Sequence, residues 1–309
     1  MERRKIRDYD LYRGHAYYVP GVGGMFALFG WFLLGGLLGG VVTAILTYFL
    51  GAEFTTTYGM LIVYPLQFMP AMMYAAFQSR KNALFEKGYA LDSKHFGRFG
   101  FALCAVLVVL GTLAVAFVGD IVNYGNYLLT ERSSFLAKMY DLVQDQMKQL
   151  TGGPIWLSLL TTAVLAPVFE EWLCRGMVLR GLLQKKSPAT AIVLSALFFA
   201  LLHLNPWQAL NAFIIGCLLG YVYYRTGSLW LTMLMHATNN ALAVVMSHID
   251  SLEDVEYFID VMSPGAYAAV MAVSIAVLCG VVVLFRRIPL ERPQGNCDEV
   301  VEELPESVA

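Results

Sequence analysis

Two adjacent carboxylates, Glu170 and Glu171, lie inside an apolar segment that runs from residue 154 to residue 183. Charged side chains are costly at membrane depth, so by default they mark a functional site. A carboxylate in apolar surroundings has lost part of its hydration. This suits it to take a proton from a water molecule and later return the proton to a leaving amine. Glu170 is therefore the predicted general base and general acid.

Glu171 is expected in a supporting position. It points about 100° around the helix from Glu170, and Arg175 follows it by one helical turn. The spacing predicts an ion pair between Glu171 and Arg175 that supports the site. An alternative remains open, in which the pair lies at a helix end, reaches the cytoplasm and has no catalytic role.

Two further apolar segments carry ionisable or amide side chains. His203 lies near the end of residues 189–205, whereas His236 and Asn240 lie four residues apart within 228–247 and therefore share one helix face. His203 can share or orient the water that Glu170 activates. His236 and Asn240 can donate hydrogen bonds to the oxyanion of a tetrahedral intermediate.

Depth in the bilayer tests whether these residues can meet. Glu170, His203 and Asn240 each lie 13 or 14 residues from the cytoplasmic end predicted for their segment, about 20 Å along a helix. His236 lies about one turn closer to the cytoplasm. Residues that cooperate must lie at one level, so these positions permit a single site.

The elements that position these residues follow from composition. Of the 309 residues, 58% are hydrophobic and 14% are charged, and the apolar residues come in blocks long enough to cross a hydrocarbon core of about 30 Å. The sequence predicts an all-α, polytopic transmembrane helical bundle of about eight spans in the cell membrane. The predicted spans are residues 25–50, 60–78, 99–118, 154–183, 189–205, 209–225, 228–247 and 265–285.

Charge placement gives the predicted orientation. Lysine and arginine accumulate on cytoplasmic flanks, and with the N-terminus inside only Arg132, Lys138 and Lys148 of the 21 basic residues fall in outer segments. An odd number of spans would put the later basic clusters outside. The distribution therefore predicts an even number of spans and places both termini in the cytoplasm.

Three parts are predicted along the chain: a basic cytoplasmic segment at 1–24, a membrane-embedded domain at 25–285 and an acidic cytoplasmic tail at 286–309. Residues 133–150 have the apolar spacing of an amphipathic helix in the outer interface. The formal net charge is −2, and no dense basic surface remains once the charges flanking the membrane are assigned. Membrane lipids are expected partners, and nucleic acid is not.

Three motifs resemble those of a known family, the CAAX-protease and bacteriocin-processing (CPBP, Abi) family of intramembrane endopeptidases, which includes the Ras-converting prenyl-protein peptidase. The resemblance covers about residues 154–247. Eight spans with the motifs in the fourth, fifth and seventh also look like that family's architecture. The motifs are E-E-x-x-x-R at Glu170, Glu171 and Arg175, F-x-x-x-H at Phe199 and His203, and H-x-x-x-N at His236 and Asn240.

The resemblance implies hydrolysis of a peptide bond in or near the membrane, with Glu170 essential and His203, His236 and Asn240 in the site. The predicted mechanism uses water activated by glutamate and no cofactor. A zinc-dependent version remains open, because Glu170, His203 and His236 could supply the three protein ligands of a catalytic Zn²⁺. Phe199 is expected to pack beside His203.

The sequence is also compatible with two other functions. One is a catalytically silent membrane scaffold or immunity factor of the same fold, and the other is a transporter or proton relay. Retention of every motif residue favours the peptidase over the scaffold. The confinement of the polar residues to 170–240 argues against the transporter. The predicted substrate is a membrane-associated peptide or protein, and a lipidated tail, a leader peptide and a transmembrane segment are all compatible with the sequence.

Overall fold

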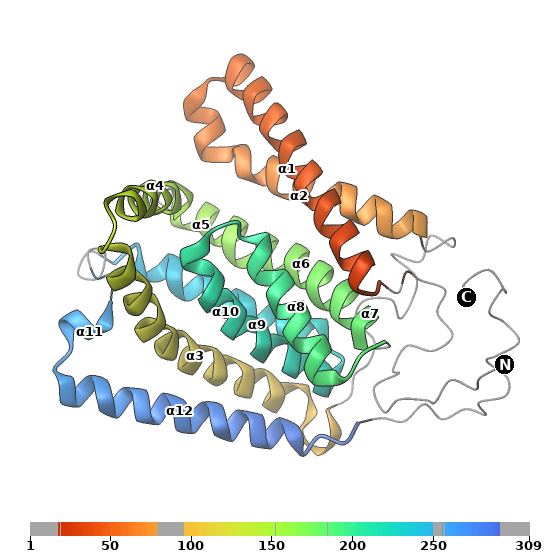
Figure 1. Cartoon of the computed structure of the whole chain (residues 1–309), viewed down its shortest axis with the longest axis vertical. Coiled ribbons are helices and arrows are strands. Elements are labelled where there is room, and N and C mark those ends of the chain that lie inside the picture. The colour runs from red at the N-terminus through yellow and green to blue at the C-terminus, as the bar shows by residue number, and fades with distance from the viewer. Residues whose placement is uncertain are drawn as a thin grey trace, which may run out of the picture.

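The structure is a computed structural model in which the described residues form a bundle of α-helices without β-strands (Figure 1). Most of the predicted N-terminal segment 1–24 and of the predicted tail 286–309 lies outside the described residues. The described residues are 18, 20–78, 96–151, 153–183, 185–249, 255 and 257–290.

Each of the eight predicted spans corresponds to a helix or to a chain of consecutive helical segments. Residues 155–183 form one such chain, in which two π-helical segments, η3 and η4, alternate with short α-helices. The elements are α1 Val22–Leu50, α2 Ala52–Gln78, the 3₁₀ turn η2 Gly97–Phe99, α3 Gly100–Thr130, α4 Ser134–Thr151, α5 Ile155–Ser158, η3 Leu159–Leu165, α6 Ala166–Glu171, η4 Trp172–Leu179, α7 Arg180–Leu183, α8 Pro188–Leu202, α9 Pro206–Thr226, α10 Leu229–Met246, α11 Phe258–Val261 and α12 Pro264–Arg286.

Capping residues fix where the helices around the site begin and end. Ser187, Asn205 and Ser263 accept hydrogen bonds from backbone N–H groups of the first turns of α8, α9 and α12, and each is followed by a proline at the first helical position. Gly227 ends α9 with φ of 61°, a left-handed conformation that favours glycine, and Ser228 caps α10 directly afterwards. The sharp turn between α9 and α10 therefore follows from two adjacent residues.

The helices that carry the predicted site residues pack around one core. α8 pairs with α9, and α10 packs against α3, α9 and the segment 155–183. Small residues allow close approach between helices: a Cβ atom at Gly216 of α9 would lie 3.2 Å from Cα of Ala196 in α8. This arrangement brings α6, α8 and α10 to a common interior.

α1 and α2 form a hairpin that leans away from the rest of the bundle, coloured red to orange in Figure 1. The two helices cross closely, since a Cβ atom at Gly35 would lie 1.9 Å from the backbone oxygen of Gln67. The hairpin touches the remaining helices through aromatic contacts, including Phe68 stacked on Phe169 with ring centroids 5.6 Å apart.

The end of the bundle that carries α4 and α11 is joined by polar contacts (Figure 1). Asp120 of α3 accepts hydrogen bonds of 2.9 Å from the backbone N–H of Phe258 and from the hydroxyl of Tyr267. Tyr140 of α4 hydrogen-bonds the hydroxyl of Tyr257. Phe135, on the other side of α4, is 69% exposed, so the helix expected at 133–150 is present and amphipathic.

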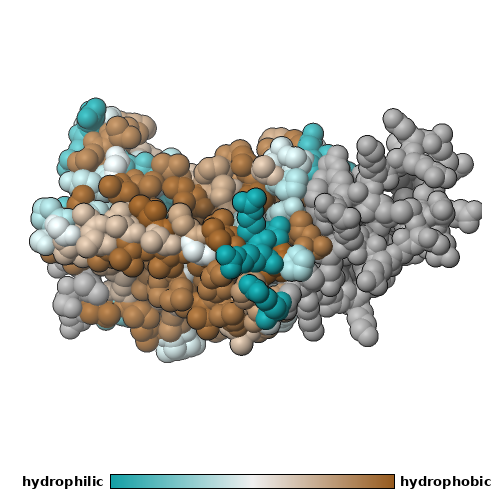
Figure 2. Space-filling model, turned by 90° about the horizontal axis from the view of Figure 1, so that it is seen from below, coloured by the Kyte–Doolittle hydropathy of each residue, from teal (hydrophilic) through white to brown (hydrophobic). Residues whose placement is uncertain are grey.

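Among the described residues, six elements are long and apolar enough to cross a membrane: α1, α2, α3, the chain 155–183, α10 and α12. The face in Figure 2 is dominated by hydrophobic residues. α8 has only 15 residues, about 22 Å of helix, and α9 has 21 residues but carries Gln208, Asn211 and Arg225. The chain is a multi-pass membrane protein whose eight predicted helices are all present, although two of them do not meet the length and hydropathy expected of a span.

The start of α1, the end of α12 and α7 lie at one end of the bundle, and α4 and α11 lie at the other (Figure 1). This places both ends of the membrane domain on the same side, as eight crossings require. Two arginines that the charge count placed on the cytoplasmic flank are instead buried: Arg175 is 0% exposed and Arg180 is 2% exposed. The interior of the protein therefore holds part of the basic charge.

Candidate active site

The carboxylates lie between two π-helical segments of one long helical chain. α6 carries Glu170 and Glu171, with η3 before it and η4 after it. A π-helix shifts the backbone hydrogen bonds from i→i+4 to i→i+5, and such segments recur at functional sites. Other side chains reach carbonyls of both segments: Asn240 of α10 donates to the Thr162 oxygen at 2.8 Å, and Ser195 of α8 donates to the Cys174 oxygen at 3.0 Å.

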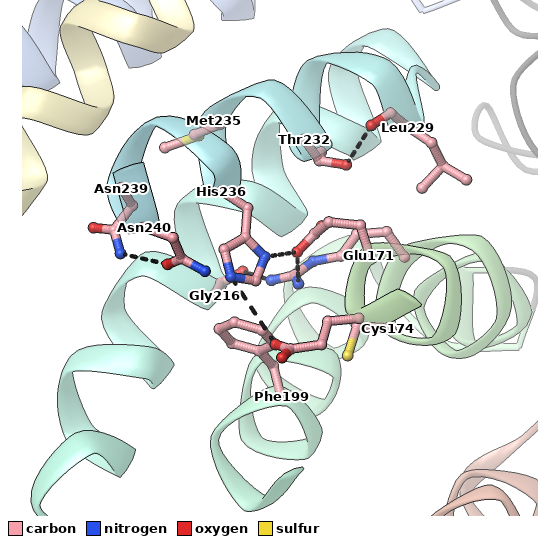
Figure 3. Close-up of polar contacts among 12 residues, drawn as sticks. Glu171, Cys174, Phe199, Gly216, Leu229, Thr232, Met235, His236, Asn239 and Asn240 are labelled. Carbon is pink, nitrogen blue, oxygen red and sulfur yellow. Dashed lines mark hydrogen bonds and ion pairs between the residues drawn. The ribbon is translucent and has the colours of Figure 1, made fainter. Parts of the chain in front are cut away.

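Glu171 bridges Arg175 and His236 in the interior (Figure 3). Its Oε1 lies 2.7 Å from Arg175 Nη1 and 3.0 Å from His236 Nδ1. Arg175 also donates to the backbone oxygen of Gly216 and lies over the ring of Phe199, with its guanidinium carbon 4.7 Å from the centroid. Glu171 and Arg175 are both completely buried, so the alternative of a pair that reaches the cytoplasm is wrong.

The two oxygens of the Glu170 carboxylate have different surroundings. Oε1 accepts a hydrogen bond from the hydroxyl of Tyr64 on α2. Oε2 is buried and has no hydrogen-bond partner among the described residues, and His236 Nε2 lies 4.0 Å from it. That distance is too long for a direct hydrogen bond. His236 therefore lies between the two carboxylates, hydrogen-bonded to Glu171 and facing Glu170.

His203 reaches the same cluster through an aromatic ring. It follows the last residue of α8, and its Nδ1 lies 2.9 Å from the carbonyl oxygen of Phe199, so a proton on Nδ1 leaves Nε2 as an acceptor. The Phe199 ring meets both imidazoles edge to face, with centroid distances of 4.9 Å to His203 and 5.3 Å to His236. Among the described residues, no hydrogen bond or ion pair joins His203 to Glu170. Phe199 thus packs beside His203, as expected, and also beside His236.

Asn240 is hydrogen-bonded to two residues beside the site. One hydrogen of its amide group is donated to Thr162, and its oxygen accepts a hydrogen bond of 3.2 Å from Asn239 (Figure 3). An amide nitrogen carries two hydrogens, so one remains for another acceptor. Asn239, the preceding residue of α10, therefore contacts Asn240 directly.

Zn²⁺ binding by Glu170, His203 and His236 is the alternative that the sequence left open. Within the part of the chain that the structure describes, no three His, Cys, Asp or Glu side chains form a cluster that could hold a metal ion. Glu170 Oε2 and His236 Nε2 lie 4.0 Å apart, and the contact of His203 Nδ1 with the Phe199 carbonyl leaves Nε2 of His203 as an acceptor. The zinc-dependent reaction therefore remains an alternative to the metal-free one.

The structure brings most of the predicted site residues into one buried cluster. Glu170, Glu171 and His236 are within contact distance of one another or of a shared partner, and His203 joins them through Phe199. The sequence interpretation missed Tyr64. It lies 14 residues from the end of α2, nearly the same depth as the predicted site residues, so the depth comparison already contained a signal for it.

The fold and the site together define a polytopic helical membrane protein with one buried and one partly buried carboxylate and two histidines beside them. Residues 152–242 match the family model described as type II CAAX prenyl endopeptidase Rce1-like, so this segment is similar to that family of endopeptidases. The matched segment contains all the motif residues, which confirms the resemblance to the CPBP family. Neither the curated proteins nor the solved structures gave a match to the chain.

Proposed function

We propose that the protein is an intramembrane endopeptidase that hydrolyses a peptide bond of a membrane-associated peptide or protein by water activated by Glu170. The observation that carries the proposal is the Oε2 atom of Glu170, which is buried, has no hydrogen-bond partner among the described residues and faces His236 Nε2. It lies in the segment that matches the endopeptidase family. Glu171 Oε2 also lacks a hydrogen-bond partner among the described residues, but Glu171 forms an ion pair with Arg175, whereas Tyr64 gives Glu170 only a neutral donor. A buried carboxylate oxygen without a partner is costly in a purely structural role, and for Glu170 this cost argues for a functional one.

In the proposed reaction, Glu170 Oε2 takes a proton from water as the water oxygen bonds to the carbonyl carbon of the substrate. His236, protonated on both ring nitrogens, donates Nδ1–H to Glu171 and Nε2–H to the oxyanion, and Asn240 donates its second amide hydrogen. Glu170 then returns the proton to the leaving nitrogen as the C–N bond breaks. The hydroxyl of the water remains on the new carboxyl group, so atoms and protons balance.

His203 has a separate proposed part. With Nδ1–H donated to the Phe199 carbonyl, its Nε2 can accept a hydrogen bond from the attacking water. Two acceptors, one on Glu170 and one on His203, would fix the direction of the water's lone pair toward the substrate carbonyl. Such positioning lowers the barrier without any bond to the substrate.

The test is a cleavage assay with the purified protein in detergent or liposomes, using fluorogenic peptides with and without a prenylated cysteine. Glu170→Gln is expected to reduce kcat/KM by about 100- to 10,000-fold, the usual range for loss of a general acid and base. Glu53→Gln is the matched control, since Glu53 is exposed in the first turn of α2. Wild-type activity in Glu170→Gln would contradict the proposed mechanism.

A chelator decides between the metal-free and the zinc-dependent reaction. In the proposal, activity survives incubation with a strong zinc chelator. Loss of activity on chelation with recovery on adding Zn²⁺ would replace the proposal with the zinc-dependent version. The prenylated and unprenylated peptides separate the substrate classes, because a preference for either one shows as a difference in kcat/KM.

A further inference from the structure

Tyr64 is the one described residue outside the family segment that hydrogen-bonds the carboxylate of Glu170. It comes from α2, far from Glu170 in sequence, and its ring packs against Phe68, with ring centroids 5.4 Å apart. Phe68 in turn stacks on Phe169, the residue directly before Glu170. The phenol is therefore held in place by the same aromatic contacts that attach the α1–α2 hairpin to α6.

The hydrogen bond from Tyr64 gives the two oxygens of the Glu170 carboxylate different roles. Oε1 is satisfied by the Tyr64 hydroxyl, whereas Oε2 is left without a partner among the described residues and faces His236. A carboxylate can rotate about its last bond unless something fixes it, because terminal torsions of this kind are broad. Anchoring Oε1 therefore fixes the direction in which Oε2 accepts a proton.

We propose that Tyr64 is a positioning residue of the peptidase: its hydroxyl orients the Glu170 carboxylate so that Oε2 acts as the base, and the α1–α2 hairpin thereby completes the site. The proposal rests on the proposed function. Tyr64 acts through Glu170 and does not touch the reacting atoms. A hydrogen bond to a carboxylate also stabilises its ionised form, which is the form a general base needs.

The first test compares Tyr64→Phe with the wild-type protein in the peptide cleavage assay. The variant keeps the ring and its packing and loses only the hydroxyl. We expect kcat to fall about 10- to 100-fold, the cost of one hydrogen bond to a charged group, with KM changed by less than about threefold. Tyr58→Phe is the matched control, because Tyr58 lies on the same helix with its side chain 38% exposed.

A stronger phenol donor separates positioning from a structural role. Incorporation of 3,5-difluorotyrosine at position 64 strengthens the hydrogen bond of the hydroxyl in a ring of nearly the same size. This substitution is expected to change kcat by about threefold or more with KM unchanged, because the hydrogen bond that it alters orients the catalytic base.

The outcomes are distinct. Wild-type kcat in Tyr64→Phe overturns the role of Tyr64, as does a fluorinated protein with wild-type kcat. If Tyr64→Phe does not fold, the fluorinated protein gives the answer alone, since it retains the ring and the hydroxyl. A wild-type protein that cleaves none of the peptides refutes the proposed function, whereas an active wild type with unchanged Tyr64 variants refutes only this inference.

Discussion

Glu170 and Glu171 are adjacent and chemically identical, and their neighbours give them different tasks. Glu171 is completely buried and shares one oxygen between Arg175 and His236, so its charge is compensated. The second oxygen of each carboxylate has no hydrogen bond among the described residues, but Oε1 of Glu170 is held by the neutral hydroxyl of Tyr64 and not by an arginine. A compensated charge supports the structure, whereas an uncompensated one is available for chemistry.

This difference predicts opposite effects of the same substitution on stability. Glu171→Gln leaves the Arg175 guanidinium buried without its counter-ion, and breaking such a pair costs about 3 to 5 kcal/mol. Glu170→Gln removes an incompletely paired charge and keeps an oxygen for Tyr64, so its stability is expected to equal or exceed that of the wild type. Thermal unfolding of the two variants in one detergent measures both effects.

A lower unfolding temperature for Glu170→Gln than for Glu171→Gln would contradict this division. The comparison of the two unfolding temperatures is also a control for the activity assay. Glu170→Gln is expected to be inactive while fully folded, whereas any loss of activity in Glu171→Gln would accompany a loss of stability. The pair thus separates an effect on the reaction from an effect on the fold.

At the scale of the elements, the apolar blocks predicted where the helices lie. Ser187 and Asn205, each followed by proline, mark the starts of α8 and α9, and the i, i+4 spacing predicted that His236 and Asn240 share a face. These signals are local, so sequence alone contains them. The π-helical segments η3 and η4 could not be predicted, because side chains from other helices hydrogen-bond their carbonyls.

The same limit explains why the sequence did not reveal the full site. The contact between Glu171 and His236 joins residues 65 positions apart, and the contact between Tyr64 and Glu170 joins residues 106 positions apart. Depth in the membrane limits which residues can be partners. It does not determine how each helix is rotated about its own axis. Rotation is fixed by packing, for example by the ring of Phe199 between the two histidines.

The α1–α2 crossing supplies a prediction at this scale. Gly35→Ala would place a Cβ atom 1.9 Å from the backbone oxygen of Gln67, so α1 must move away from α2. Because Gln67 is three residues from Tyr64, the shift is expected to lower both the unfolding temperature and kcat.

Gly40→Ala is the matched control on α1, since a Cβ atom there meets nothing within 4 Å. Alanine is favoured over glycine in a helix by about 1 kcal/mol, so this control is expected to be as stable as the wild type or more stable. Equal behaviour of the two variants in the unfolding and cleavage measurements would show that the crossing does not position Tyr64.

At the scale of the whole molecule, the bundle has two distinct ends. α7, the start of α1 and the end of α12 share one end, and the sequence carries most of its basic residues in the segments predicted for that side (Figure 1). The last connection at the other end, residues 248–264, contains five acidic residues and no lysine or arginine. The positive-inside rule therefore predicts that the end with α7 faces the cytoplasm.

Cysteine labelling tests this orientation, because the sequence has only five cysteines and four of them lie in α3, η4, α9 and α12. The fifth, Cys297, belongs to the predicted cytoplasmic tail. A membrane-impermeant maleimide is expected to label Cys297 only after the cells are permeabilised. Ser134→Cys in a Cys297→Ser background introduces an exposed thiol at the start of α4 and is expected to react in intact cells. The reverse pattern would invert the topology, and labelling of both positions from outside would mean an even number of crossings between α4 and the tail, instead of the predicted odd number.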